Sequence, residues 1–316
     1  MLRGQFATRF EILPLHRMIC SRPPATCVIR KAYMSDDPTT GAAPTMNEGD
    51  GPQRPGEAGL RRLTFLGTGD ALNGERAQSG LALPLSGGET MLIDTSSGTV
   101  LLGRLEAVGI PLESVRHLFL SHRHFDHVGG FAPLLATLAS LPEASLLVYA
   151  APDTLRALRK LLDLTLPGAE GWLGARLGWR ELIPGKPTEV GETEVTPFSL
   201  DHGLECVGFR IAQPGAVAAL SIDTRPTSEI AEHASGADLL VHDAYGPRSA
   251  AEQAHAMGHS TATEAGETAR AAGVRRLVLT HLRSSRFVDP AALAAEAETV
   301  FGGPVSAAQD LETIEF

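Results

Sequence analysis

Short apolar runs alternate with amphipathic segments along most of the chain, and this alternation predicts strands interleaved with helices. Apolar runs bounded by Gly, Pro, Asn or Asp are typical of buried strands. Segments with apolar residues at helical spacing that begin near Pro or end at Gly are typical of surface helices. The predicted strands are 62–66, 81–84, 90–94, 117–120, 146–150, 188–190, 194–200, 206–211, 216–222, 238–242, 276–280 and 313–316, and the predicted helices are 99–108, 131–141, 152–164, 228–234, 260–272 and 289–301.

The two halves of this pattern are comparable. Each half begins with strands that form hairpins, the first of them turning at 86–88, and continues with strand and helix units. This order predicts an α/β fold in which two sheets are packed between outer helices. Residues 166–187 contain Trp172, Trp179 and several Gly and Pro, and we expect them to form a loop or lid.

The first 60 residues lack a sustained hydrophobic period. Their second half is rich in Pro, Gly, Asp, Glu and Thr, a composition that cannot bury enough apolar surface to offset the entropy of ordering. We therefore expect a disordered tail at 1–60 and one folded domain at 61–316. Residues 1–33 contain five arginines, so a targeting segment is one alternative. A wrongly assigned start is a second alternative, with Met34 or Met46 as the true first residue.

Composition excludes several classes of protein. A chain of 316 residues with 43% hydrophobic and 20% charged residues can bury a large core, which excludes collagen, coiled coil and disorder throughout. Its apolar runs are shorter than the roughly 18 residues that a membrane span requires, so we do not expect this chain to be an integral membrane protein. Cys20, Cys27 and Cys206 are too few for a disulfide scaffold, and a reducing, cytoplasmic location is expected.

Charge disfavours one class of partner. The first 60 residues hold 7 basic and 6 acidic side chains, which leaves 20 basic and 31 acidic ones in the remainder, a net charge of −11. Such a surface repels polyanions at long range. The charge therefore disfavours extended binding of nucleic acid unless a local basic patch overrides the field.

The strongest chemical signal is a histidine-rich loop that directly follows a predicted buried strand. At 121–127 the chain reads Ser-His-Arg-His-Phe-Asp-His, and each buried imidazole would need its own polar partner, whereas a divalent metal gives them a common one. His122 and His124 can point at one ion from an extended loop, while Asp126 and His127 turn toward a second. Imidazole and carboxylate ligands without thiolate suit zinc, with manganese or iron as alternatives.

Further candidate ligands lie at or just beyond the ends of predicted strands. These are His202, Asp223 and His281. Strand ends converge at one edge of a sheet, where loops carry function, so we expect these residues to complete two metal sites. His122, His124 and His202 would form one site and Asp126, His127 and His281 the other, with Asp223 bridging them.

Several motifs together resemble the metallo-β-lactamase superfamily, and within it the ribonuclease Z-like branch that includes phosphodiesterases and some arylsulfatases. The resemblance covers about residues 62–316. Its motifs are Phe-Leu-Gly-Thr-Gly at 65–69, Leu-Ile-Asp at 92–94 with Gly-Thr at 98–99, the histidine loop at 121–127, Leu-Asp-His at 200–202 with Gly-Phe-Arg at 208–210, Asp-Thr-Arg-Pro at 223–226, His-Ser-Thr-Ala at 259–262, Leu-Thr-His at 279–281 and a last strand over 308–314.

The resemblance implies a four-layer αββα sandwich of two mixed sheets and a centre of two zinc ions, with manganese or iron as alternatives, held by the seven ligands above. It gives Asp94 the role of holding the histidine loop by hydrogen bonds. It places His259 against the substrate rather than against a metal. His242 matches no ligand position, so we expect it beside the site or in the core.

The chain departs from the transfer-RNA-processing members of this branch in one place. Those members carry a long basic arm between the third and fourth motifs, whereas here only 20 residues separate His202 from Asp223. Together with the acidic domain, this argues against maturation of transfer RNA unless another subunit supplies the clamp. The expected partner is therefore a small-molecule ester, and we expect no binding to a membrane. The chain could also form a homodimer.

The predicted function is that of a phosphodiesterase, which attacks a small phosphodiester through a hydroxide bridging two metals. Asp126 would orient the hydroxide while ligating, and His259 would donate a hydrogen bond or proton to the reacting group. Arylsulfatase or lactonase activity is the nearest alternative, and ribonuclease Z-type 3′-processing of transfer RNA is a weaker one. An oxygen-using diiron protein and a metal-stabilised binding module without turnover complete the alternatives.

Overall fold

The computed structural model describes residues 61–316, which contain two seven-stranded β-sheets, and the expectations for residues 1–60 lie outside the described residues. In spatial order the first sheet consists of β14 (Thr313–Glu315), β1 (Arg62–Gly67), β2 (Gly80–Pro84), β3 (Thr90–Ile93), β4 (Val115–Leu120), β5 (Leu146–Ala150) and β6 (Leu177–Glu181). The second consists of β13 (Val305–Ala307), β12 (Arg276–Thr280), β11 (Leu239–Asp243), β10 (Ala216–Ser221), β9 (Glu205–Gln213), β8 (Thr193–Asp201) and β7 (Thr188–Val190).

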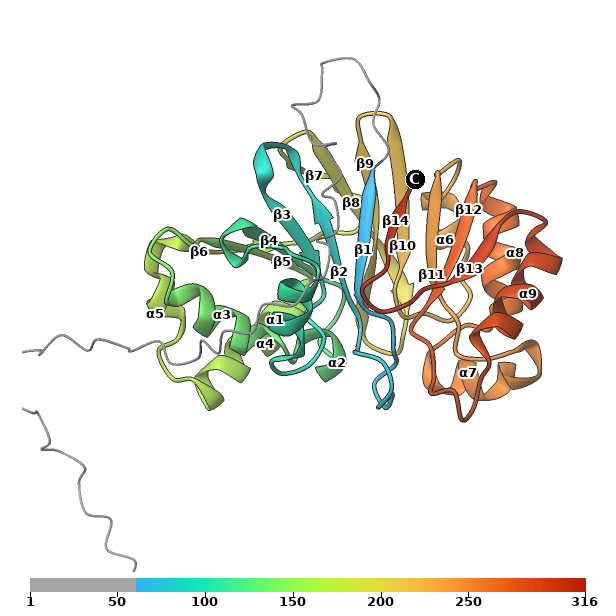
Figure 1. The fold of residues 1–316 in the computed structure, drawn as a ribbon, viewed down its shortest axis with the longest axis horizontal. Coiled ribbons are helices and arrows are strands. Elements are labelled where there is room, and N and C mark those ends of the chain that lie inside the picture. Colours follow the sequence, from blue (N-terminus) through green and yellow to red (C-terminus); the bar gives the residue numbers. More distant parts are fainter. Residues whose placement is uncertain (1–60) are drawn as a thin grey trace, which may run out of the picture. The chain divides into compact units, whose positions relative to one another are not determined.

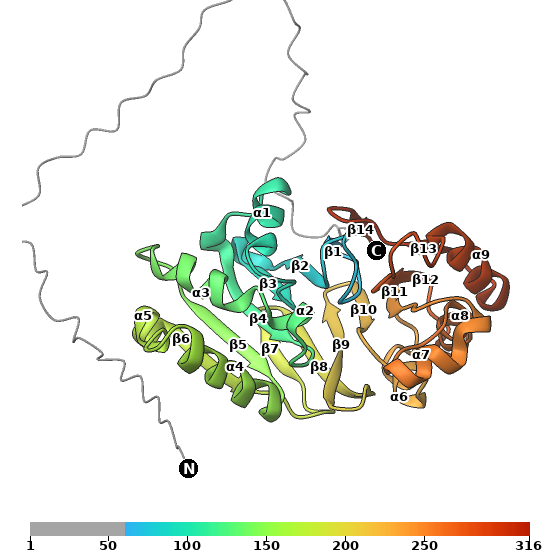
Figure 2. The same ribbon diagram turned by 90° about the horizontal axis from the view of Figure 1, so that it is seen from below.

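Helices flank the sheets on their outer sides (Figures 1 and 2). Those of the first half are α1 (Val100–Ala107), α2 (Phe125–Val128), α3 (Phe131–Ala139), α4 (Pro152–Thr165) and α5 (Glu170–Leu173). Those of the second half are α6 (Ser228–His233), α7 (Ala251–Met257), α8 (Ala262–Ala272) and α9 (Pro290–Phe301). Among the described helices, each is too short or too polar to traverse a bilayer.

Both sheets are mixed, and the inner ones of their parallel strands are buried on both faces. In the first sheet β3 to β6 run parallel, and in the second β10 to β13 do. Strands covered on both faces need continuous apolar runs, which explains why segments such as Leu146–Ala150 show no polar alternation. The start of helix α4 follows from a local sequence signal, because proline is favoured in the first turn of a helix and Pro152 is the first residue of α4.

Three apolar clusters divide the molecule into layers. The central cluster joins the inner faces of the two sheets and includes Phe65 and Phe119 from the first and Phe209 and Val241 from the second. A second cluster packs the first sheet against α1, α3 and α4, and a third packs the other sheet against α6, α8 and α9. The order helix, sheet, sheet, helix confirms the expected four-layer sandwich.

The prediction of a loop at 166–187 is wrong for part of that segment. It contains α5 and β6, and β6 pairs with β5 in parallel, with Trp179 opposite Val148. This edge strand, Leu177–Glu181, is exposed at its last two residues, so it lacks the apolar run by which the inner strands were recognised. Helix α7 and strand β13 were likewise missed, because one is polar and the other has only three residues.

Candidate metal centre

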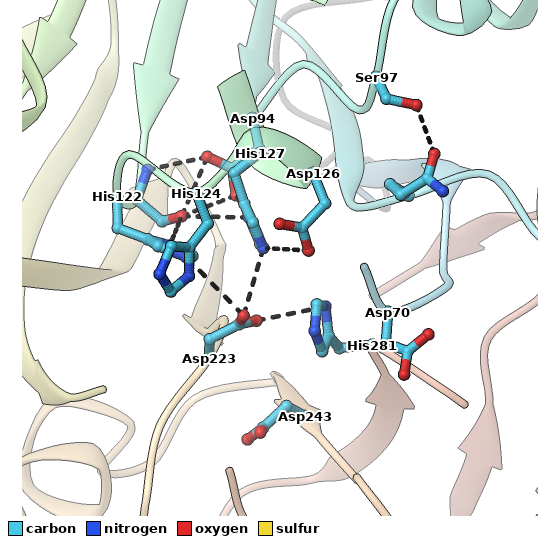
Figure 3. A network of polar contacts seen from close by, with 12 residues as sticks. Asp70, Asp94, Ser97, His122, His124, Asp126, His127, Asp223, Asp243 and His281 are labelled. Carbon is cyan, nitrogen blue, oxygen red and sulfur yellow. Dashed lines mark hydrogen bonds and ion pairs between the residues drawn. The ribbon is translucent and has the colours of Figure 1, made fainter. Parts of the chain in front are cut away.

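The histidine loop joins β4 to α2 and is held from beneath by the buried carboxylate of Asp94. The backbone N–H of Ser121 donates to Asp94 Oδ1 at 2.8 Å, and its hydroxyl donates to Oδ2 at 2.8 Å. His127 donates from Nδ1 to Asp94 Oδ2 at 2.7 Å. One carboxylate therefore fixes both ends of the loop and directs Nε2 of His127 away from itself (Figure 3).

A close approach of backbones anchors the far side of this loop. Gly130 follows α2, and a Cβ at this position would lie only 2.1 Å from the carbonyl oxygen of Thr95. The hydroxyl of Thr95 donates to the carbonyl of His127 at 2.8 Å. Only glycine allows this contact, so the pair of glycines that follows His127 in the sequence serves the position of the loop.

Three imidazoles form the first group of candidate ligands. His124 Nδ1 lies 3.0 Å from Nε2 of His122 and 3.1 Å from Nε2 of His202. His202 donates from Nδ1 to the carbonyl of Gly258 at 2.8 Å, which leaves its Nε2 lone pair directed at the group. The nitrogen atoms of the three rings therefore converge on one point, although His202 comes from the end of β8, far along the chain.

The second group consists of Asp126, His127, Asp223 and His281, whose ligand atoms all lie within 4.8 Å of one another. Asp223 Oδ2 lies 3.3 Å from His127 Nε2, and Asp223 Oδ1 lies 3.3 Å from His281 Nδ1. The same Oδ2 is 3.6 Å from His202 Nε2 in the first group. Figure 3 shows Asp223 between the histidine loop and His281, so its carboxylate lies between the two groups.

Unpaired polar atoms in this region show that the residues fit metal ions. Within the described part of the chain, His127 Nε2, Asp223 Oδ1 and His281 Nδ1 are buried and have no hydrogen-bond partner. Burying such atoms without a partner costs free energy, whereas a divalent cation would satisfy all three together. The donors are imidazole nitrogen and carboxylate oxygen without thiolate, a set that suits zinc and also manganese or iron.

The electrostatics of the region favour the ionisation states that ligands need. Burial alone would raise the pKa of Asp223, but the imidazoles of His281 and His127 outweigh it and hold that pKa well below its ordinary value. Burial likewise works against ionisation of Asp126, yet His127 lowers its pKa to about 2. Burial holds the pKa of His122 well below its usual range, so this ring is neutral.

His127 differs from the other residues of the site because its surroundings favour a positive charge. Burial would lower its pKa, but the carboxylates of Asp223, Asp126 and Asp94 outweigh burial and raise that pKa well above the ordinary value. Three carboxylates around one imidazole create a place that attracts a cation. A metal ion would supply that charge and would leave His127 neutral.

His259 lies beside both groups and is held by a second buried carboxylate. Its Nδ1 donates to Asp243 Oδ2 at 3.1 Å, and the backbone N–H of Ser260 donates to the same oxygen at 3.2 Å. Burial lowers the pKa of His259, but the hydrogen bond to Asp243 and the charges of Asp223 and Asp243 together outweigh burial and raise the pKa. The ligand atoms of His202, Asp223 and His259 also lie within 4.8 Å of one another, so geometry alone allows His259 to be a ligand.

Asp243 was missed as a site residue from the sequence. It ends β11, the strand between β10, which leads to Asp223, and β12, which leads to His281. Its position at a strand end was the signal that identified the other two. The neighbouring His242 is buried in β11, with Nδ1 at 2.9 Å from the carbonyl of Asp243, and belongs to the core.

Comparisons with known proteins agree with this fold. The family model described as the beta-lactamase superfamily domain matches residues 89–282. Ribonuclease Z of Methanopyrus kandleri is 30% identical over 276 residues, covering 76% of this chain and 92% of that protein. Ribonuclease Z of Haloferax volcanii is 29% identical over 307 residues, covering 80% of this chain and 94% of that protein.

A solved structure adds support for the fold. The metallo-β-lactamase fold protein YhfI from Bacillus subtilis aligns with a TM-score of 0.70 at 24% identity, covering 82% of this chain and all of that one. At this identity the likeness concerns the fold alone. The chain is thus similar in sequence to ribonuclease Z proteins over most of their length and similar in fold to YhfI.

Proposed function

The chain belongs to the metallo-β-lactamase superfamily and to its ribonuclease Z-like branch, and from this premise we propose that it hydrolyses phosphodiesters at a dinuclear metal centre. Membership makes it a metal-dependent hydrolase acting on ester bonds. The observation that carries the proposal is Asp223, a buried carboxylate with one oxygen toward His281 and the other toward His127 and His202. A phosphodiester is the ester whose charge such a centre suits best.

The proposed ligands form two sets. His122, His124 and His202 would hold one ion and Asp126, His127 and His281 the other, with Asp223 shared. When bound, two divalent ions would activate a water molecule and neutralise the charge that develops on the phosphoryl oxygens. Zinc is the proposed metal, with manganese or iron as alternatives.

The side chains of the chain itself would orient the reactants and move one proton. Asp126 is ionised because its pKa is about 2, so it can accept a hydrogen bond from the attacking water and aim it. His259 binds Asp243 through Nδ1, which leaves Nε2 to donate its proton to the departing alkoxide. The raised pKa of His259 favours the protonated ring that this transfer needs.

We propose a small diester as the substrate because the second sheet carries no long arm beside the site. Strands β9 and β10 form a tight hairpin in which Gln213 pairs with Ala216, so only two residues form the turn. The net charge of −11 beyond residue 60 also disfavours a long polyanion. A cytoplasmic location is proposed with it, since Cys206, a free thiol, is buried within the sheet.

Processing of transfer RNA at its 3′ end is the second candidate. It is favoured by the relatives from Methanopyrus kandleri and Haloferax volcanii, both named ribonuclease Z. Action on an aryl sulfate or a lactone would use the same centre on a different electrophile.

A substrate panel tests the proposal. Metal-loaded wild-type protein would be given bis(p-nitrophenyl) phosphate, p-nitrophenyl sulfate, a γ-lactone and a transfer-RNA precursor with a 3′ extension, with Asp223→Ala as the inactive control. We expect the highest kcat/KM on the phosphodiester and no specific cleavage of the precursor. Efficient cleavage at the 3′ end of the precursor, or faster turnover of the sulfate or lactone, would replace the proposal.

A further inference from the structure

A cavity of about 350 Å³ adjoins the candidate centre on the side of His259 and His281, which form part of its lining. Its other walls come from three segments: the loop after β1, the region from β11 to α7, and the loop after β12. The lining is therefore assembled by the fold rather than by one stretch of sequence. Because both histidines belong to the proposed site, a group in the cavity would be attached to the reacting ester.

The mouth of this cavity is apolar and exposed. Leu72, Met257 and Phe287 are 85%, 57% and 66% exposed and come from the three different segments. In the described part of the chain only eight large hydrophobic side chains are exposed, so three around one cavity are a concentration. Exposed apolar surface gathered around a hollow favours an apolar ligand group, which would remove it from water.

One cation lies against two aromatic side chains of the cavity wall. The guanidinium of Arg283 lies 4.4 Å from the ring centre of Tyr245 and 4.5 Å from that of Phe287. Residues 61–316 provide it with neither a hydrogen bond nor an ion pair. The two aromatic rings therefore hold the guanidinium at the wall of the cavity while its N–H groups remain available for an oxyanion.

The charge of the cavity limits what that oxyanion can be. Asp70 lines the same cavity, and Figure 3 shows it beside His281. Apart from His259, whose proton is given to the reacting ester, the charged groups of the lining are one arginine and one carboxylate, which leave no excess positive charge for a second anionic group on the ligand. The oxyanion that fits Arg283 is therefore the reacting diester itself, and the rest of the ligand in the cavity should be uncharged.

We propose that this cavity binds an uncharged aromatic or alkyl group of the phosphodiester, while Arg283 contacts a non-bridging phosphoryl oxygen. This inference rests on the proposed function and narrows it to diesters with at least one apolar alcohol. Leu72, Met257 and Phe287 are the residues that set this preference. Arg283 contributes to the affinity for every diester and does not distinguish apolar from small ones.

Binding of two non-hydrolysed analogues tests the inference without turnover. Methyl(phenyl)phosphinate and dimethylphosphinate carry the same single negative charge, have no P–O–C bond to cleave and differ only in the apolar group. Calorimetric titration of the metal-loaded protein should give a Kd about tenfold lower for the phenyl analogue, the factor expected for burying part of a ring. Phe287→Ala and the independent Leu72→Ser should each reduce this ratio to about threefold or less.

Two further variants separate the roles. Leu164→Ala, which removes a leucine of α4 that is 74% exposed and lies outside this cavity, should leave the ratio unchanged. Arg283→Met should weaken both analogues by a similar factor and leave their ratio near ten. A ratio near one in wild type, or a ratio that neither cavity variant changes, would overturn the inference.

Turnover of bis(p-nitrophenyl) phosphate by the same preparations keeps this inference distinct from the proposed function. Turnover together with equal binding of the two analogues would overturn the apolar cavity and leave the phosphodiesterase proposal standing. A tenfold ratio without turnover of any diester would support the cavity and overturn the proposed reaction.

Discussion

At the scale of single residues, Asp223 is the side chain on which both proposed metal sites depend. It lies two residues after the end of β10, is buried, and has a carboxylate oxygen within 3.6 Å of a ring nitrogen of His127, His202 and His281. A buried carboxylate is stabilised only when positive charge or hydrogen-bond donors surround it. A cation on each side of Asp223 would therefore stabilise its buried carboxylate.

Replacing this carboxylate should empty both sites. We expect wild-type protein to bind about two transition-metal ions per chain, since seven ligands exceed the four of one tetrahedral zinc, and Asp223→Ala to bind fewer than one. Elemental analysis by mass spectrometry after gel filtration measures this. Asp238→Ala, which removes an acidic residue that contacts Arg275 and the start of β10, should retain both ions. A wild-type content of one ion that added metal does not increase would contradict the shared carboxylate.

His259 and His281 should respond differently to truncation. If His259 contacts substrate and not metal, His259→Ala should keep two ions while kcat falls by about 10² to 10⁴-fold, the range for a lost general acid. His281→Ala should lose metal, because no histidine lies within residues 282–286 to replace it. Metal content and turnover measured on the same samples check both expectations. Loss of metal in His259→Ala would make His259 a ligand, which its distance from Asp223 and His202 permits.

The carboxylate of Asp243 should set the upper end of the pH range. It raises the pKa of His259 by favouring the imidazolium, so His259 keeps its proton to higher pH. Asp243→Asn removes the charge, the pKa falls, and the decline of kcat at basic pH should move to lower pH while the metal content stays at two. Asp201→Asn, which alters an exposed carboxylate paired with Arg225, is the control and should leave the profile in place. A shift to higher pH, or none, would remove His259 as the proton donor.

At the scale of secondary-structure elements, the position of His259 depends on helix α8, which begins three residues later. The hydroxyl of Thr261 accepts a hydrogen bond from the backbone N–H of Glu264, and the carboxylate of Glu264 accepts one from the backbone N–H of Thr261. These two bonds form a capping box that stabilises the first turn of the helix. The helix then packs closely on α9. At Gly266 an added Cβ would lie 2.5 Å from the carbonyl oxygen of Ala297.

A matched pair of glycine substitutions tests this close packing. Gly266→Ala should lower the free energy of unfolding by about 1 to 3 kcal/mol, because the methyl group meets backbone that cannot move aside without shifting α9. Gly103→Ala, in helix α1, meets nothing within 4 Å and should raise it by about 0.5 to 1 kcal/mol. Urea denaturation followed by circular dichroism gives both values. Equal effects of the two substitutions would show that α8 and α9 are less closely packed.

At the scale of the whole molecule, the candidate site lies where segments from both sheets meet. β4 and β3 of the first sheet lead to the histidine loop and to Asp94, and β10, β11 and β12 of the second lead to Asp223, Asp243 and His281. The apolar cluster between the sheets fixes this relation, since its members come from both. All proposed ligands and the three apolar clusters belong to residues 61–316.

A chain that starts near residue 59 should therefore keep both fold and activity. We propose residues 61–316 as one domain, and the two sheets with their shared core account for its stability. Unfolding temperature, metal content and kcat/KM of the shortened protein should agree with those of the full chain. The full-length protein, prepared in parallel, is the reference. Insoluble expression or a large loss of kcat/KM would show that the first 58 residues contribute to the fold or the site.

The sequence by itself determined the parts that depend on neighbours along the chain. Strand and helix segments follow from periodicity, and the candidate ligands of the histidine loop follow from their spacing within six residues, because one short loop can direct them at a common point. His202, Asp223 and His281 could be added because parallel strands end at one edge of a sheet. Edge strand β6 escaped this reasoning, since its half-exposed residues carry no apolar run.

Only the tertiary structure decided which distant side chains meet. The pairing of His259 with Asp243 crosses from β11 to the start of α8, and the stacking of Arg283 on Tyr245 brings a loop after β12 against the segment after β11. No periodicity or spacing in the sequence predicts either contact, because each contact depends on the order of strands in the sheet. That order is fixed by burial of both sheet faces, a property of the whole molecule.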